Sequence, residues 1–395
     1  MTGSPDIVLL SGVRTAIGAY GGSLKDQPLT DLAAACVAEA VKRAGIEASE
    51  VGHVVFGNVI HTEPRDMYLA RVAGVKAGLP VETPAFTVNR LCGSGLQAIV
   101  SAAQVIVMGD ADCAVAGGAE SMSRVPYWAP TARFGQRMGH AQLLDAMVGA
   151  LTDPFDDCHM GMTAENIASK WRISREEQDA LALESHRRAA RAIDSGWFDS
   201  QILPVALRTR KGTTLFDKDE HVRREATMES LAKLAPAFDP KGSVTAGNAS
   251  GLNDAAAAVV LMTAERARER GLKPMARLAG YAHAGVEPRY MGIGPVPAVR
   301  RLLDRTGIRL DDVDFIELNE AFAAQAIAVA RDLELPPEKT NPNGSGISLG
   351  HPVGATGCIL AVKAIHELAR TRSRYALVTM CIGGGQGIAA LFERL

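Results

Sequence analysis

The segment VKRAGIEASEVGHVVFGN, residues 41–58, returns 262 positions later in the chain as LDRTGIRLDDVDFIELNE, residues 303–320. Identical pairs between the two copies include Gly45 and Gly307, Ile46 and Ile308, and Val51 and Val313. In both copies an amphipathic helical run ends at the glycine, the residue that most often follows a helix, and a strand-like run comes next. The repeat predicts a βα-type half that has been duplicated.

Each copy continues with a glycine-rich turn, a helix, a strand and a second glycine cluster, from Cys92 to Gly118 and from Gly350 to Gly385. Strand-like runs at 7–10, 54–56 and 112–116 alternate with helical runs at 29–44 and 95–108, which is typical of α/β proteins. We expect two halves packed face to face. Their loops should converge at the carboxyl ends of strands, where α/β sheets bind ligands.

The middle of the chain breaks this alternation. Residues 121–249 carry many aromatic and charged side chains and few clean strands, and the apolar run at 254–262, a helix or a strand, resumes the core. The predicted organisation is an N-terminal half (1–120 and 250–272), an inserted loop domain (121–249) and a C-terminal half (273–395).

Composition restricts the function classes. With 395 residues, 47% of them hydrophobic, and a net charge of −2, the chain is neither disordered nor a nucleic-acid-coating protein. No apolar run reaches the ~20 residues that span a bilayer, and the first ten residues lack the basic region of a secretory signal. Six scattered cysteines without a C-x-x-C pair predict no metal site, no disulfide framework and a cytoplasmic protein.

Cys92 is the first candidate for chemistry. It lies in VNRLCGSGLQA, residues 88–98, where a strand-like run turns through small residues into an apolar helix. The unpaired N–H groups at the start of that helix favour a thiolate. The alternative for a free cysteine is a buried structural role, which apolar surroundings predict for Cys36, Cys113 and Cys358.

The C-terminal half supplies partners for this thiol. His351 stands between two glycine turns, just before a helical run. Cys381 begins CIGGGQG at the end of a strand, and Asn319 follows the strand of the repeat. Two cysteines, a histidine and an asparagine at loop tips predict a Cys/His nucleophile with a separate acid or base. A dinucleotide loop in CIGGGQG is excluded, because it does not match G-x-G-x-x-G and too few residues follow for the required helix and strand.

Five motifs occur in order along the chain: NRLCGSGLQA (89–98), GNASGLNDAAAA (247–258), NEAFAAQ (319–325), GSGISLGHPVGATG (344–357) and CIGGGQG (381–387). Together they resemble the thiolase family, over essentially the whole chain. Within that family the chain is most similar to biosynthetic acetyl-CoA acetyltransferases, and among these to the bacterial β-ketothiolases of polyhydroxyalkanoate synthesis. The resemblance implies the thiolase fold, with two duplicated βαβαβαββ-type halves in five layers (α-β-α-β-α) and an inserted loop domain.

The resemblance implies a reversible condensation of acetyl-CoA with a short acyl-CoA to a 3-ketoacyl-CoA and free CoA. In the family, the residue matching Cys92 carries the acyl group, the one matching His351 activates that thiol, and the one matching Cys381 removes the α-proton. The match of Asn319 holds a water that forms one oxyanion hole with His351, and the N–H groups of Cys92 and Gly383 form the other. Acyl-CoA and CoA are the implied partners, with no further cofactor.

The resemblance also implies where coenzyme A binds. The matching positions are His159, Met160, Arg223, Arg224, Ser230, Phe238, Ala246, Gly247, Ser250, Met291 and Phe322. The alternative for the two arginines is a solvated surface. Residues around 123–142 match the loop that joins dimers of biosynthetic thiolases, which implies a homotetramer. Propionyl-CoA and slightly longer acyl groups are implied substrates beside acetyl-CoA.

Three rival functions share parts of this pattern. A decarboxylating ketoacyl synthase has a nucleophilic cysteine but needs no second base, so the presence of Cys381 disfavours it. A degradative 3-ketoacyl-CoA thiolase of β-oxidation runs the same reaction in the opposite direction. A catalytically inactive, thiolase-like acyl-CoA-binding protein is disfavoured because Cys92 and His351 are both present.

Overall fold

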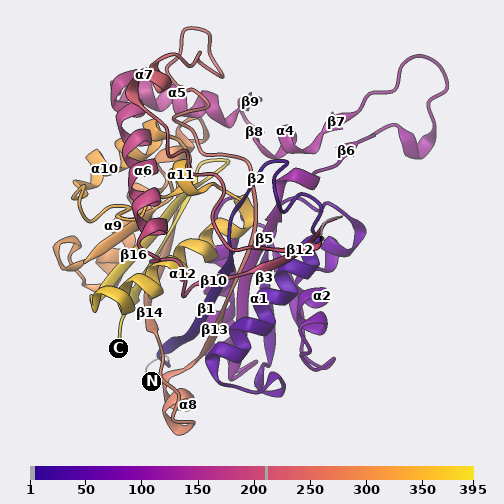
Figure 1. Ribbon diagram of the computed structural model, residues 1–395, viewed down its shortest axis with the longest axis vertical. Helices are drawn as coiled ribbons and strands as arrows, with labels where there is room; N and C mark the ends of the chain where they lie inside the picture. Colours follow the sequence, from indigo (N-terminus) through magenta and orange to yellow (C-terminus); the bar gives the residue numbers. More distant parts are fainter. Residues whose placement is uncertain (1–4, 210–211) are drawn as a thin grey trace.

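One mixed sheet of eleven strands runs through both halves of the molecule, whose computed structural model describes residues 5–209 and 212–395 (Figure 1). The first four residues of the N-terminal stretch, together with Arg210 and Lys211, lie outside the described residues. At the centre of the sheet, β1 (Ile7–Thr15) pairs with β14 (Ala276–Gly285) and joins the halves.

The two halves contribute strands in the same order. From the centre outward, the N-terminal half has β1, β13 (Asn253–Thr263), β5 (Cys113–Ser121), β3 (His53–Gly57) and β4 (Ala85–Val88). The C-terminal half has β14, β17 (Gln386–Glu393), β16 (Tyr375–Ile382) and β15 (Phe315–Leu318), and an isolated parallel bridge from Ile316 to Thr340 extends the series. In each half the second strand is antiparallel to both neighbours and the outer strands are parallel. The predicted duplication is confirmed.

The repeated segment forms the same local structure twice. Helix α1 (Leu29–Ala44) ends at Gly45 with φ 68°, and α9 (Pro295–Thr306) ends at Gly307 with φ 69°. This left-handed backbone is unfavourable for residues with a Cβ atom, which explains the glycine in both copies. A short 3-10 turn then leads into β3 in one copy and β15 in the other.

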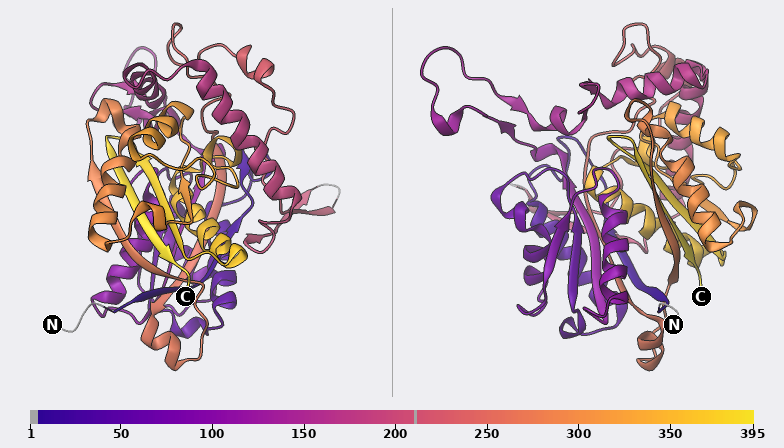
Figure 2. Two further views of the ribbon diagram at one scale, coloured as in Figure 1. Left: turned by 90° about the vertical axis from the view of Figure 1, so that its left-hand side faces the viewer. Right: turned by 180° about the vertical axis from the view of Figure 1, so that it is seen from behind.

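Helices cover the sheet in layers (Figure 2). Between the halves, α3 (Ser94–Val107) packs against α12 (Val353–Thr371). On the outer faces, α1 and α2 (Leu69–Lys76) cover the N-terminal strands, and α9 covers the C-terminal strands with α10 (Ala323–Leu333) beside it. The two central helices approach closely because glycines face one another, and a Cβ atom on Gly95 would lie 2.6 Å from the backbone N of Cys358.

The segment between β5 and β13 consists of helices and short strand pairs. Its helices are α4 (Ala146–Ala150), α5 (Met160–Lys170), α6 (Arg175–Asp194) and α7 (Met228–Ala232). Its strand pairs are β6–β7 (Tyr127–Trp128, Leu144–Asp145), β8–β9 (Thr152–Asp153, Cys158–His159) and β11–β12 (Val205–Thr209, Gly212–Phe216). The β6–β7 hairpin projects far from the body of the molecule (Figures 1 and 2). Because β10 (Ile202–Leu203) pairs with β1, this segment also adds to the main sheet. The domain boundaries at 121, 250 and 273 stay a prediction.

Several strands are longer than their sequence patterns indicate. β1 continues to Thr15, β5 continues to Ser121, and the run at 254–262 is the strand β13. Gly117, in the glycine cluster that follows the expected strand, lies within β5 and is extended against the ring of Phe56, where a side chain would clash. The remaining elements are short: β2 (Gly18–Ala19), α8 (Ala264–Glu269) and α11 (Gly346–Leu349). Within the described residues, none of the helices has the length and apolarity to cross a membrane.

Candidate active site

A cavity of about 530 Å³ lies where the loops that begin α3 and α12 meet. Cys92, His351, Cys381 and Gly383 all line it. The rest of its surface is mainly apolar, and residues of the inserted segment form one wall. The fold thus brings together residues from three separate segments of the chain. Of these, Cys381 lies within β16 and not at the expected loop tip.

Cys92 stands in a tight turn between β4 and α3. Leu91 adopts a left-handed backbone with φ 46°, uncommon for a residue with a side chain. Ser94 holds the turn: its Oγ accepts a hydrogen bond from the Arg90 N–H (2.9 Å) and donates one to the Leu91 carbonyl (2.6 Å). The Cys92 sulfur lies at the cavity, with the N–H groups of Gly383 and Cys92 directed at it.

Cys92 is protonated at neutral pH, whereas the sequence favours a thiolate. Burial raises the pKa of the Cys92 thiol to about 11, although the two N–H groups act in the opposite direction. The expectation of a resting thiolate at the helix N-terminus is therefore wrong, since the desolvation of a charged sulfur outweighs the partial charge of the helix. Cys92 is a thiol at neutral pH and needs a base to become a nucleophile.

His351 lines the same cavity as Cys92, and its ring is held by a neighbouring hydroxyl. Its Nδ1 lies 2.6 Å from the Thr356 hydroxyl, which itself donates to the Pro352 carbonyl (3.0 Å). Because the hydroxyl hydrogen is already used, Nδ1 carries a hydrogen and Nε2 keeps its lone pair. Burial lowers the pKa of His351 to about 4, so the ring is neutral at neutral pH. A neutral imidazole with a lone pair on Nε2 can accept a proton.

Asn253 fixes the backbone before this histidine. Its Oδ1 accepts the His351 N–H (2.9 Å) and its Nδ2 donates to the Gly18 carbonyl (3.0 Å). Gly350 has φ 109°, and a side chain there would collide with Asn253. The position of His351 in the C-terminal half is thus tied to β13 of the N-terminal half.

Cys381 and Asn319 complete the polar groups of the site. Cys381 is the last residue but one of β16, and burial beside Cys92 raises the pKa of its thiol. Asn319 follows β15 behind the cavity lining, with its Nδ2 3.5 Å from the His351 Nε2. The Asn319 Oδ1 is buried and has no hydrogen-bond partner among the described residues. A buried oxygen of this kind is an acceptor for an ordered water.

Glu120 is a residue that the sequence reasoning missed. Its buried carboxylate accepts hydrogen bonds from the N–H groups of Val59, Ile60 and Gly354 and from the Asn58 Nδ2. Burial raises the pKa of Glu120 to about 8 against the effect of these N–H groups. The carboxylate connects the start of α12 with a loop that lines the cavity. A signal was present: one acid follows a glycine pair at the end of an otherwise apolar run.

Most residues assigned to coenzyme A line the cavity. They are His159, Met160, Arg223, Phe238, Ala246, Ser250, Met291 and Phe322. The rings of His159 and Phe238 stack at 4.7 Å, and Phe238 meets Phe322 edge to face at 6.1 Å. His221, which the sequence reasoning did not single out, also lines the cavity, and burial lowers its pKa to about 4.

Three residues assigned to coenzyme A lie elsewhere in the described structure. Arg224 is exposed and forms an ion pair with Asp194 (2.9 Å). Ser230 is exposed and caps α7 together with Thr227. Gly247 is buried under the side chains of Leu231 and Leu234. Arg223 and Arg224 are both exposed, but only Arg223 lines the cavity, so the solvated-surface alternative describes Arg224 and stays open for Arg223.

Comparisons with known families cover nearly the whole chain. The family model described as "Thiolase, N-terminal domain" matches residues 7–265, and the one described as "Thiolase, C-terminal domain" matches residues 272–394. The beta-ketothiolase BktB of Cupriavidus necator is 64% identical over 391 residues, which cover 99% of each chain. An acetyl-CoA acetyltransferase of Syntrophomonas wolfei is 50% identical over 395 residues, again 99% of each chain.

Solved structures agree with these matches. The acetyl-CoA acetyltransferase of Bacillus anthracis superposes with a TM-score of 0.98 at 46% identity and covers 100% of both chains. Human mitochondrial 3-ketoacyl-CoA thiolase in complex with CoA superposes with a TM-score of 0.95 at 43% identity, over 99% of this chain and 98% of that one.

Proposed function

The chain belongs to the thiolase family, and we propose that Cys92, His351 and Cys381 carry out its β-ketothiolase reaction, the reversible condensation of acetyl-CoA with a short acyl-CoA. One observation supports this assignment above the others. Two thiols and a neutral imidazole line the same largely apolar cavity, beside the N–H group of Gly383. This arrangement provides a nucleophile, its activating base and a second acid or base. The 64% identity to a protein named beta-ketothiolase supports it independently.

The first half-reaction transfers the acyl group to Cys92. Nε2 of His351 takes the Cys92 proton as the sulfur attacks the thioester carbonyl. The oxyanion that forms is stabilised by the N–H groups of Cys92 and Gly383, where charge develops. The carbon–sulfur bond of the acyl-CoA breaks, and the CoA thiolate leaves with the proton of Cys381. The enzyme then holds a thioester at Cys92, an imidazolium at His351 and a thiolate at Cys381.

The second half-reaction forms the carbon–carbon bond. The Cys381 thiolate removes the α-proton of acetyl-CoA, and the enolate oxygen is held by His351 and by a water on the unpaired Oδ1 of Asn319. The carbanion attacks the thioester at Cys92, the 3-ketoacyl-CoA leaves, and Cys92 regains its proton from His351. Every proton is returned, so the cycle needs CoA thioesters and no further cofactor.

Coenzyme A binds along the apolar wall of the inserted segment. The flat stack of His159 and Phe238 and the side chain of Ser250 suit a pantetheine chain, and Arg223 at the same cavity suits a phosphate. Assembly into a homotetramer through the projecting hairpin is part of the proposal. Exposed apolar side chains are concentrated on this hairpin, and such a concentration is typical of a protein contact. They are Tyr127, Trp128, Phe134, Met138, Leu143 and Leu144. A cytoplasmic location suits the two reactive thiols, which need a reducing compartment.

The first prediction concerns the range of acyl-chain lengths that the enzyme accepts. Met160 and Met291 pack in one apolar cluster with Cys381, and flexible methionines adapt to chains of different length. Thiolysis of acetoacetyl-, 3-ketovaleryl- and 3-ketohexanoyl-CoA should therefore proceed with kcat/KM values within about tenfold of one another. Met291→Phe should lower the six-carbon value by about tenfold relative to the four-carbon value, because overpacking typically costs 1–3 kcal/mol. A steep fall after four carbons in the unaltered protein would exclude the broader substrate range.

A further inference from the structure

The wall that faces the substrate between α7 and β13 has almost no regular secondary structure. Ala237, Phe238, Ala246, Ala249 and Ser250 line the cavity from this stretch. One isolated bridge lies within the stretch, from Pro236 to Thr245, and another ties it to the start of α10, from Ala249 to Phe322. In its middle, the Glu165 carboxylate accepts the N–H groups of Ser243 and Val244. A segment without the backbone hydrogen bonds of a helix or a sheet keeps one conformation only when side-chain contacts hold it.

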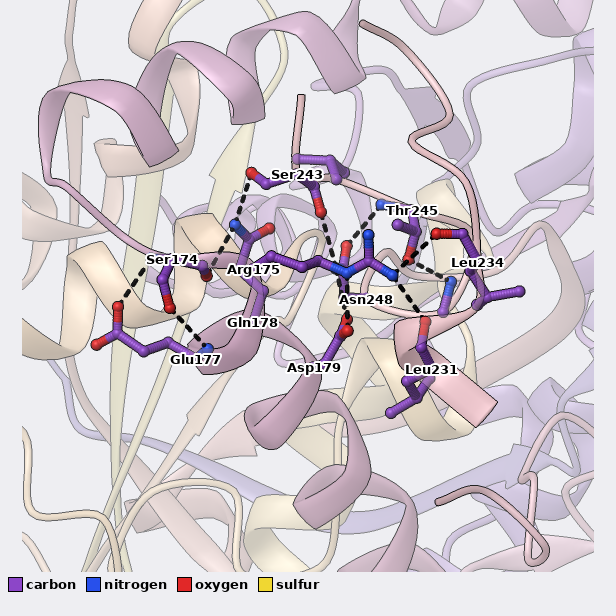
Figure 3. A network of polar contacts seen from close by, with 12 residues as sticks. Ser174, Arg175, Glu177, Gln178, Asp179, Leu231, Leu234, Ser243, Thr245 and Asn248 are labelled. Atoms are coloured by element: carbon purple, nitrogen blue, oxygen red, sulfur yellow. Dashed lines mark hydrogen bonds and ion pairs between the residues drawn. The ribbon is translucent and has the colours of Figure 1, made fainter. Parts of the chain in front are cut away.

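Arg175 and Asp179, one turn apart on α6, hold the start of this wall (Figure 3). Nη2 of Arg175 donates to the carbonyls of Leu231 (2.7 Å) and Leu234 (3.0 Å), the last carbonyls of α7 and of the turn after it. Nε of Arg175 donates to the Asp179 Oδ2 (2.7 Å), so the carboxylate fixes the guanidinium in place.

The other oxygen of Asp179 holds the end of the wall. Asp179 Oδ1 accepts from the Asn248 Nδ2 (2.9 Å), and this Nδ2 also donates to the Ser243 carbonyl (3.1 Å). The side-chain Oδ1 of Asn248 accepts the N–H of Thr245 (2.8 Å). The backbone carbonyl of Asn248 accepts the N–H of Ala323 at the start of α10 (2.8 Å). Asp179 thus connects both ends of the segment through its two oxygens (Figure 3).

Neither Arg175 nor Asp179 lines the cavity. Asp179 is 2% exposed, and breaking a buried, fully hydrogen-bonded ion pair leaves unpaired groups that drive local rearrangement. The segment most free to rearrange is the wall itself, because the helices on either side keep their own backbone hydrogen bonds.

We propose that Arg175 and Asp179 are positioning residues for coenzyme A thioesters: they hold residues 231–250 in the shape that receives the pantetheine chain. The inference rests on the proposed function, since it assumes that this wall contacts CoA. It assigns the pair to substrate affinity and not to the bond-forming steps, because the thiols and His351 belong to other segments.

The test measures steady-state kinetics and CoA binding for Arg175→Met, Arg175→Lys and Glu184→Gln. Arg175→Met should raise KM for acetoacetyl-CoA and for CoA about tenfold with kcat within threefold, and Arg175→Lys, which keeps one donor, should lie between. Glu184→Gln is the matched control: it removes an ion pair of the same spacing, with Arg188 on the same helix, away from the wall. Its KM should equal that of the unaltered protein.

A second readout is independent of turnover. The CoA concentration that raises the unfolding temperature by a fixed amount should increase about tenfold in Arg175→Met. Unchanged KM and unchanged CoA response would overturn the inference, as would a fall in kcat alone. If Arg175→Met does not fold, Arg175→Lys decides by the same measurements. An unaltered protein that binds CoA but lacks thiolase turnover would contradict the proposed function. The role of Arg175 would then be decided by the change in unfolding temperature with CoA concentration.

Discussion

Cys381→Ser should still accept an acetyl group from acetyl-CoA at Cys92 but lose condensation by about 10³-fold. The physical reason is the division of labour between the two thiols. The CoA thiolate is a stable leaving group near neutral pH, so acylation survives the loss of a proton donor. Removal of the α-proton has no substitute base, and positioned bases contribute about 10²–10⁴-fold. Mass spectrometry of the intact protein measures acetylation, and acetoacetyl-CoA formation measures condensation.

The matched control for this variant is Cys158→Ser. Cys158 is a free cysteine outside the cavity lining, so its replacement should change neither measurement. Normal condensation by Cys381→Ser would move the general base to another residue. Loss of acetylation together with condensation would mean that Cys381 acts in the first half-reaction as strongly as in the second.

Cys92→Ser should abolish covalent acetylation and reduce both condensation and thiolysis by about 10³-fold or more. A serine hydroxyl is far less acidic than a thiol, and the same imidazole therefore activates it poorly. With a pKa of about 11, the Cys92 thiol needs a base to ionise, which is the role proposed for His351. The measurements are the acetyl mass increase and the thiolysis of acetoacetyl-CoA.

Unaltered acetylation of Cys92→Ser would place the acyl acceptor elsewhere and contradict the assignment of the whole site. The fold of the variant is checked by its unfolding temperature, which should change little because serine has nearly the volume of cysteine and Cys92 lines the cavity. Together the two variants separate the half-reactions: Cys92 is required in both, and Cys381 mainly in the second.

The architecture could be predicted from the sequence because its signals are local. Gly45 and Gly307 end equivalent helices with the same left-handed backbone, and this requirement is visible in each copy of the repeat. The same holds for the loop tips, since the turns before α3 and α12 need glycines and small residues next to Cys92 and His351. Strand ends were less predictable, because Gly117 is extended only through its contact with Phe56.

The electrostatics of the site could not be predicted, because they depend on burial. The helix N-terminus beside Cys92 is a local feature, but the desolvation that opposes it comes from the packing of both halves. The role of Glu120 is likewise distributed, since its hydrogen-bond donors lie 60 or more positions away in the sequence. Arg224 and Ser230 show the limit of transfer by motif: both lie outside the cavity lining, although Arg223, next to Arg224, is part of it.

The crossing of α3 and α12 limits how far this chain can tolerate substitution. A methyl group on Gly95 would meet the backbone of α12, and one on Gly357 would meet the backbone of α3 at Leu96. Cys92 and His351 stand directly before these helices, and reacting groups must be held to within about 0.5 Å. Positions that carry no functional group therefore determine the alignment of those that do. In a saturation scan, they should rank beside the catalytic residues in their intolerance of change.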